Sequence, residues 1–286
     1  MFVITGANGQ TGGAVARTLL QQNQPVRVVL RPGRPSQEWR DQGAEVAHAD
    51  VQDAAALTVA FTGTRAAYVL NPPDYLVNDM LVSAHAVADA YRAALAASGT
   101  RAVALSAMGS QHAEGTGNIV TTYILEQALR PLGASFVRPG SFMPNWLSSV
   151  PAMRTGVLPS FFAPVDRQFP QVAVADIADT VVRELRRGDS RTVELAGPAD
   201  YAPTDVAAAF ASALGQPITA QSIERDQWPQ ALSQFGLPPS AINGLIEMWE
   251  GFNSGHIEFE GIPERGQVTI EDFAKASVGG DAETRT

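Results

Sequence analysis

Three glycines near the start of the chain have the spacing of a loop that binds a dinucleotide. The stretch Gly6-Ala7-Asn8-Gly9-Gln10-Thr11-Gly12 follows an apolar run and opens a helical pattern, which is the context that gives this G-x-x-G-x-x-G motif its meaning. A helix N-terminus offers free N–H groups and the positive end of its dipole to phosphate. We expect the cofactor phosphates to contact Gly6, Asn8, Gly9, Gln10, Thr11 and Gly12. A glycine-rich turn without a ligand is the alternative.

Two arginines after the second apolar run indicate which dinucleotide is bound. NAD-binding versions of the motif carry an acid about twenty residues past the glycines. The corresponding stretch here reads Leu30-Arg31-Pro32-Gly33-Arg34 and has no acid. Because a guanidinium matches phosphate oxygens in a bidentate fork, Arg31 and Arg34 are expected to hold the 2′-phosphate of NADP(H). The alternative is that both are solvated loop residues.

Further cofactor contacts are expected where other strands end. Asp50 follows the third expected strand and either lies near the adenine or caps the helix that follows. Asn71 and Pro72 follow the fourth strand and Pro139 ends the sixth. In a parallel α/β sheet, ligands bind at the carboxyl ends of the strands, so these residues are predicted to contact the cofactor.

Aromatic residues after the sixth strand are candidates for a substrate cleft. Phe142, Met143, Asn145 and Trp146 follow Pro139 closely, and aromatic side chains suit a flat apolar ligand. The alternative is that these four residues belong to an ordinary core. His112 lies in the 110–117 loop, which is expected to border the nicotinamide pocket. It either donates a proton there or is a solvated loop residue.

The composition excludes several classes of site. The chain of 286 residues has no cysteine, which excludes disulfides, thiolate catalysis and thiolate metal sites. No spacing of metal ligands is present, so no metal is expected. The net charge of −9 disfavours nucleic acid as a partner. No apolar run is long enough to cross a bilayer and no signal peptide is recognisable, so we expect no membrane contact and a cytoplasmic location.

The elements that position these residues alternate between strands and helices. This order predicts an α/β fold with a doubly wound parallel sheet, a Rossmann fold, and a smaller, mostly helical lobe on the substrate side. Residues 1–140 and 166–198 are assigned to the dinucleotide-binding domain, 141–165 and 199–277 to the lobe, and 278–286 to a flexible tail. Strands are expected at 2–5, 26–30, 45–48, 66–70, 101–105, 134–138 and 192–196, and helices at 11–22, 36–42, 53–61, 76–98, 118–132, 174–187 and 204–214, the last with Thr204 as its cap.

Several motifs resemble the NmrA-like branch of the atypical short-chain dehydrogenase/reductases, and the resemblance covers nearly the whole chain. They are TGANGQTG, VVLRPGRP, HADVQD, FVRPGSFMPN, VAVADIADTV and VELAGPADYAPTDVAAAFASALGQPI. Within the branch, the chain looks most similar to bacterial NADPH:quinone oxidoreductases and dye reductases. The resemblance implies the Rossmann fold and NADP(H). It specifies the substrate only weakly, because the branch also holds proteins that only sense the cofactor.

One departure from the superfamily concerns its usual proton donor. Common members use a serine with Tyr-x-x-x-Lys on one helix, where the i, i+4 spacing places both side chains on one face. Ser106 stands where such a serine should, and Tyr123 is the candidate tyrosine, but Gln127 occupies the lysine position. Some relatives place Lys or His at the position of Thr122. The only lysine in the chain is Lys275, so a lysine-assisted tyrosine is excluded.

The missing lysine narrows the acceptors that could be reduced. A ketone becomes an alkoxide whose pKa is near that of water, far above neutral pH, and therefore needs a strong positioned acid. A quinone becomes a phenolate with a pKa of roughly 10, which needs only hydrogen bonds. We expect an NADPH-dependent oxidoreductase that transfers hydride to a quinone-like or other small aromatic acceptor polarised by Ser106 and Tyr123, in a monomer or homodimer. The alternative is a non-catalytic NADP(H) sensor that recruits a protein partner.

Overall fold

The computed structural model describes residues 1–72, 74–77 and 79–278. A parallel sheet of eight strands forms its centre, in the order β13-β10-β6-β5-β4-β1-β2-β3. The strands are β1 Phe2–Thr5, β2 Val26–Leu30, β3 Glu45–His48, β4 Ala66–Val69, β5 Arg101–Leu105, β6 Ser135–Pro139, β10 Thr192–Ala196 and β13 Glu264–Arg265. The central strands β1, β2 and β4 are buried on both faces and therefore read as short apolar runs in the sequence. The predicted doubly wound parallel sheet is confirmed.

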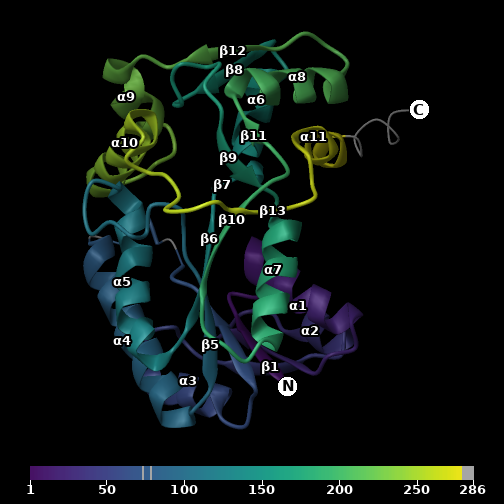
Figure 1. The fold of residues 1–286 in the computed structure, drawn as a ribbon, viewed down its shortest axis with the longest axis vertical. Coiled ribbons are helices and arrows are strands. Elements are labelled where there is room, and N and C mark those ends of the chain that lie inside the picture. Colours follow the sequence, from purple (N-terminus) through teal and green to yellow (C-terminus); the bar gives the residue numbers. More distant parts are fainter. Residues whose placement is uncertain (73, 78, 279–286) are drawn as a thin grey trace.

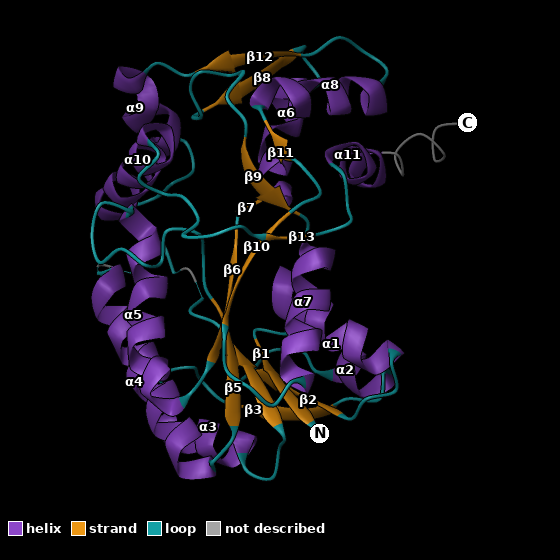
Figure 2. Cartoon of the chain, viewed as in Figure 1, coloured by secondary structure: helices purple, strands orange, loops and turns teal. Residues whose placement is uncertain are grey.

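Helices cover both faces of this sheet (Figures 1 and 2). On one face, α1 Gln10–Gln21 packs against α7 Val174–Arg186, close to the short α2 Gln37–Asp41. On the other, α4 Met80–Ser98 lies between α3 Ala54–Phe61 and α5 Val120–Leu129. The strand order reverses between β4 and β1, and a reversal of this kind opens a crevice at the carboxyl ends of the strands.

The lobe above those carboxyl ends has its own apolar core and two small sheets (Figure 1). Its strands are β7 Ser141–Phe142, β8 Val157–Ser160, β9 Phe169–Val172, β11 Asp200–Tyr201 and β12 Thr219–Ser222. Its helices are the 3₁₀ helix η3 Met143–Ser149, α6 Val150–Met153, α8 Pro203–Leu214, α9 Trp228–Ser233, α10 Pro239–Ser254 and α11 Ile270–Val278. Shorter 3₁₀ turns are η1 Gly117–Ile119, η2 Arg130–Leu132 and η4 Arg225–Gln227.

Several expected boundaries differ from the structure for local reasons. The helix expected from residue 76 begins at Met80, because the Asp79 carboxylate accepts from the N–H groups of Leu81 and Val82 and caps it there. The expected Thr204 cap is wrong: α8 begins at Pro203, and the Asp205 carboxylate accepts from the backbone N–H of Ala202.

The dinucleotide-binding domain and the lobe each contain a strand from a segment that the sequence assigned to the other. β9, from the 166–198 segment, pairs with the lobe strands β7 and β11. β13, from the 199–277 segment, joins the edge of the main sheet. Of the expected tail, Val278 is the buried last residue of α11, and residues 279–286 lie outside the described residues.

Candidate functional site

A cavity of about 720 Å³ lies at the carboxyl ends of the central strands. Nine residues predicted to bind the cofactor line it: Gly6, Asn8, Gly9, Gln10, Thr11, Arg31, Arg34, Asn71 and Pro72. Leu70 and Ser106 lie along the same cavity, immediately after β4 and β5. The structure therefore brings together the glycine turn, the arginine loop and the loop after β4, as the strand order requires. We refer to it below as the cofactor cavity.

The glycine turn has the backbone geometry of a phosphate cradle. Gly6 has a positive φ of 63°, and the Gly9 N–H donates to its carbonyl oxygen at 2.8 Å. Gly9 is the N-cap of α1 and carries no side chain that could occupy the helix N-terminus, and the first turn of α1 has no acidic residue. These features fit a dinucleotide phosphate, which needs free N–H groups and no competing negative charge.

Gly12 and Asn8 support the turn in different ways. A Cβ on Gly12 would lie 2.3 Å from the Gly6 carbonyl oxygen, so this position serves the packing of the helix on the strand rather than the lining of the cavity. The Asn8 side-chain oxygen accepts a 2.9 Å hydrogen bond from Trp39 Nε1 and so ties the turn to α2. No pattern in the sequence indicates this role of Trp39, because the contact joins two separate βα connections.

Arg31 and Arg34 lie at the edge of the cavity in the loop after β2. Both are exposed, and neither has an ion-pair partner among residues 1–72, 74–77 and 79–278. Most arginines elsewhere on the surface are engaged with a carboxylate or a carbonyl oxygen, as Arg27 is with Glu45 at 3.0 Å. Two unpaired guanidinium groups beside a phosphate cradle fit a second phosphate.

Besides Gly12, two of the predicted cofactor residues lie outside the lining of this cavity. The Asp50 carboxylate accepts from the Gln52 N–H at 2.9 Å and holds the turn before α3, whereas Asp53 caps that helix. The neighbours of Asp50, Ala49 and Val51, line the cavity. Pro139 lines the adjoining cavity described below instead.

Ser106 belongs to a buried polar network. Its Oγ donates to Glu126 Oε1 at 2.6 Å, and Glu126 is 1% exposed. The two oxygens of Glu126 also accept from Arg138 Nε and Nη2 and from Arg130 Nη2, each at 2.8 Å. The carboxylate thus accepts every one of these hydrogen bonds. The Ser106 hydrogen therefore points into the protein, and its oxygen offers only lone pairs to the cavity.

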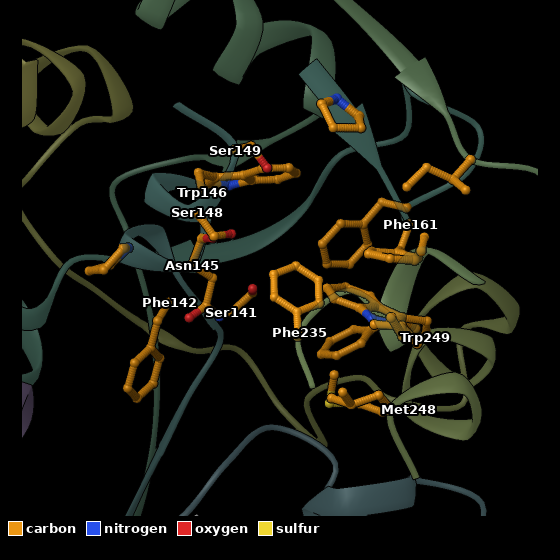
Figure 3. A pocket seen from close by; sticks show the side chains of 18 of the residues that line it. Ser141, Phe142, Asn145, Trp146, Ser148, Ser149, Phe161, Phe235, Met248 and Trp249 are labelled. Atoms are coloured by element: carbon orange, nitrogen blue, oxygen red, sulfur yellow. The ribbon is translucent and has the colours of Figure 1, made fainter. Parts of the chain in front are cut away.

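A second cavity of about 810 Å³ adjoins the first and extends into the lobe. We call it the lobe cavity. Phe142, Asn145 and Trp146, predicted to line a substrate cleft, are among its lining residues. Figure 3 shows the segment from Ser141 to Ser149 on one side and Phe161, Phe235, Met248 and Trp249 on the other.

The aromatic wall of the lobe cavity is rigidly packed. Trp146 Nε1 donates to Gln171 Oε1 at 2.7 Å, and Gln171 Nε2 donates in turn to the Tyr201 carbonyl oxygen at 2.9 Å. Phe161 stacks on Trp249 with ring centroids 5.4 Å apart, and Phe162 meets Trp249 edge-on at 4.6 Å. These contacts fix the ring orientations before any ligand enters.

The two cavities share six lining residues: Tyr75, Ala107, Ile119, Phe142, Asn145 and Met248. Tyr75 and Asn145 are the polar side chains of this junction. Burial raises the pKa of Tyr75 above its ordinary value of 10.0, so its hydroxyl stays protonated and can donate a hydrogen bond. The sequence analysis missed Tyr75, although it lies only three residues past Pro72 in the loop after β4.

Three of the predicted catalytic or substrate-binding residues line neither cavity in the described structure. Tyr123 packs against the core cluster around α3, α4 and α5 and lines neither cavity. Met143 is fully buried in the lobe core. His112 stacks on His256 with ring centroids 4.2 Å apart and lines neither cavity. The structure thus places these three residues outside the lining of both cavities.

Metal sites and membrane-spanning helices are both absent from the described residues. Within residues 1–72, 74–77 and 79–278, no group of three His, Cys, Asp or Glu side chains could hold a metal ion. No helix in the same part of the chain has the length and hydropathy needed to cross a membrane.

The sequence and the fold are both similar to those of known oxidoreductases. The chain is 25% identical to the NAD(P)H azoreductase of Xenophilus azovorans (96% of this chain, 97% of the relative) and 27% identical to quinone oxidoreductase 2 of Escherichia coli (89% of each). It is 31% identical to the (4-alkanoyl-5-oxo-2,5-dihydrofuran-3-yl)methyl phosphate reductase of Streptomyces griseus (84% and 83%).

Among solved structures, an NADPH-dependent quinone oxidoreductase from Escherichia coli in complex with NADPH superposes with a TM-score of 0.79 at 24% identity, over 97% of this chain and 99% of that chain. Residues 1–275 match the model of the NmrA-like family. The chain therefore belongs to the NmrA-like family.

Proposed function

We propose that this protein is an NADPH-dependent oxidoreductase that transfers hydride to a flat conjugated acceptor such as a quinone. The observation that carries the proposal is the junction of the two cavities. A cavity with a phosphate cradle and two unpaired arginines opens onto an aromatic cavity through six shared residues. The relatives whose names are azoreductase and quinone oxidoreductase support the same reaction class.

The cofactor cavity accounts for each part of NADP(H). Gly6, Gly9 and the N-terminus of α1 would hold the pyrophosphate, and Arg31 and Arg34 would hold the 2′-phosphate. The nicotinamide, when bound, supplies the hydride. The distance from the glycine turn to Ser106 is spanned by one continuous cavity, so the nicotinamide end would lie near the junction with the lobe cavity.

The side chains of the junction would act on the acceptor by hydrogen bonding. Tyr75 carries a protonated hydroxyl and Asn145 carries amide hydrogens, so both can donate to an acceptor oxygen that gains charge. Ser106 offers lone pairs only, because its hydrogen is held by Glu126. It would therefore orient a donor group, such as an amide, rather than polarise the acceptor.

This arrangement suits a quinone better than a ketone. A phenolate-like product, with a pKa of about 10, needs only neutral hydrogen bonds. An alkoxide needs a strong positioned acid, and no lysine or histidine lines either cavity among the described residues. The aromatic walls exclude water and offer flat faces to a ring system.

The alternative function is a non-catalytic NADP(H) sensor with a protein partner. The missing Tyr-x-x-x-Lys pair favours it. A preformed aromatic cavity of about 810 Å³ beside the cofactor cavity disfavours it, because a sensor needs no second ligand. A cytoplasmic location and a monomeric or homodimeric state remain predictions.

A turnover assay with a panel of acceptors tests the proposal. We expect steady NADPH oxidation with quinones, above the uncatalysed rate, and little with simple ketones. A protein that binds NADPH tightly but oxidises it with no quinone would contradict the proposal and favour the sensor.

A further inference from the structure

The lobe cavity is lined without a single charged side chain among the described residues. Its polar lining consists of neutral groups: Tyr75, Ser141, Asn145, Ser148, Ser149 and Gln234, with the indoles of Trp146 and Trp249. The remaining lining residues are apolar or glycine. In a chain with 17% charged residues, this exclusion of charge from so large a cavity restricts what can bind there.

The charged residues of α10 that adjoin lining residues point away from the cavity. Glu247 and Glu250 share α10 with Met248 and Trp249, yet both are exposed. Glu250 pairs with Arg225 at 2.5 Å. The unpaired arginines of the site, Arg31 and Arg34, line the cofactor cavity and not the lobe cavity. Arginine side chains therefore line the cofactor cavity but not the lobe cavity.

The lobe cavity is also two-sided. The wall from Ser141 to Ser149 presents hydroxyl and amide groups beside the rings of Phe142 and Trp146, whereas the facing wall presents Phe161, Phe235 and Trp249 (Figure 3). Its volume of about 810 Å³ lies in the upper part of the range of small-molecule sites, roughly 300–1,000 Å³. A single-ring quinone would leave much of that space unfilled.

We propose that the lobe cavity selects an uncharged acceptor with more than one ring and excludes phosphorylated, sulfonated and carboxylated acceptors. The oxygens of the acceptor would face the Ser141–Ser149 wall and its hydrocarbon face would lie on the aromatic wall. An anion entering this cavity would lose its hydration and find no cation in exchange, which is strongly unfavourable. The inference rests on the proposed function and adds the charge and size of the substrate.

The first test compares a naphthoquinone with the same naphthoquinone carrying one sulfonate. The sulfonate withdraws electrons and makes the ring easier to reduce, so any preference for the neutral compound comes from the protein. We expect kcat/KM for the sulfonated compound to be lower by about a hundredfold or more. Comparable values for the two compounds would overturn the inference and leave the proposed function standing.

The second test places a cation at the rim of the cavity. Gln234 is an exposed lining residue at the end of α9, and Gln230 is an exposed residue of the same helix that does not line the cavity. In Gln234→Arg, the ratio of kcat/KM for the sulfonated compound to that for the neutral compound should rise by about tenfold. In the matched Gln230→Arg, the ratio should equal that of the wild type. Equal ratios in both variants and the wild type would count against the inference.

A binding measurement separates the inference from the proposed function. Trp146 and Trp249 line the cavity, so an acceptor bound there should quench tryptophan fluorescence whether or not it is reduced. If neither compound is turned over, the proposed function fails. Quenching by the neutral compound alone would still support the charge selection, and equal quenching by both would overturn it.

Discussion

Ser106 Oγ donates a 2.6 Å hydrogen bond to Glu126 Oε1, and this bond turns its hydrogen away from the cofactor cavity. Glu126 lies on α5. Arg138, near the end of β6, donates one hydrogen bond to each oxygen of the Glu126 carboxylate. The serine that ends β5 is thus a hydrogen-bond acceptor toward the cavity, not the donor that its place in the sequence suggests.

Ser106→Ala should therefore reduce activity only modestly. It removes a hydrogen bond that lies within the protein and leaves the Glu126–Arg138 pair intact, so kcat/KM with a quinone should fall by about tenfold or less. Steady-state kinetics with a neutral naphthoquinone measures this. A loss beyond about a hundredfold would mean that Ser106 donates in the transition state, which the observed direction of its hydrogen bond forbids.

Tyr75→Phe and Tyr123→Phe form a matched pair. Tyr75 lines both cavities and Tyr123 lines neither, so Tyr75→Phe should lower kcat/KM by up to about tenfold while Tyr123→Phe stays near the wild type. Burial raises the pKa of Tyr75 above 10.0. Its donor is consequently present at all lower pH values and is lost only as the pH rises through that raised pKa. Steady-state kinetics should show a larger loss of kcat/KM for Tyr75→Phe than for Tyr123→Phe. A larger loss for Tyr123→Phe would refute the assignment of Tyr75 as the hydrogen-bond donor to the acceptor.

Gly9→Val and Gly12→Ala should fail in different ways. A Cβ on Gly9 meets only the Gly6 carbonyl oxygen, at 3.2 Å, and the φ of Gly9 is −93°, so the variant should fold but lose NADPH because the side chain occupies the phosphate site. A Cβ on Gly12 would lie 2.3 Å from the same oxygen, so Gly12→Ala should lower the melting temperature. For each variant, thermal unfolding measures the melting temperature and NADPH titration measures the affinity for the cofactor. Normal NADPH affinity in folded Gly9→Val would remove the case for the phosphate cradle.

Phe235→Ala should affect substrate binding without affecting the fold. Phe235 lines the lobe cavity yet is 59% exposed, so a bound acceptor would cover apolar surface that is otherwise in water. Its removal should raise KM several-fold, consistent with about 1 kcal/mol of lost burial, and leave the melting temperature unchanged. Leu132→Ala is the control, since Leu132 is 40% exposed and lines neither cavity. An unchanged KM for Phe235→Ala would place the acceptor elsewhere.

The main sheet and the glycine turn could be predicted from the sequence because their signals are local. β1, β2, β3, β5 and β10 lie where the sequence predicted them. β1 and β2 are buried on both faces and therefore need apolar runs, whereas β3 is an edge strand with exposed ends. β13 is only two residues long, too short for any periodic pattern, and its place depends on a long return of the chain to the sheet edge.

The candidate site was harder to predict where its geometry depends on tertiary contacts. The direction of the Ser106 hydrogen bond depends on Glu126, twenty residues away along the chain. The i, i+4 pattern places Tyr123 on a helix, but it does not fix the rotation of that helix, which packs Tyr123 against the buried core cluster around α3, α4 and α5. Tyr75 lies in an irregular loop, so only the fold shows that it reaches the junction of the cavities.

The most direct test of the account compares NADPH with NADH as the donor to a neutral naphthoquinone, in the wild type and in Arg31→Ala. Arg31 lines the cofactor cavity and has no ion-pair partner in the described part of the chain, so its guanidinium is free for the 2′-phosphate. We expect the wild type to favour NADPH in kcat/KM by about tenfold or more, and Arg31→Ala to lose most of that preference with little change for NADH. No enzyme-dependent oxidation of either nucleotide, or an equal preference in both proteins, would contradict the account.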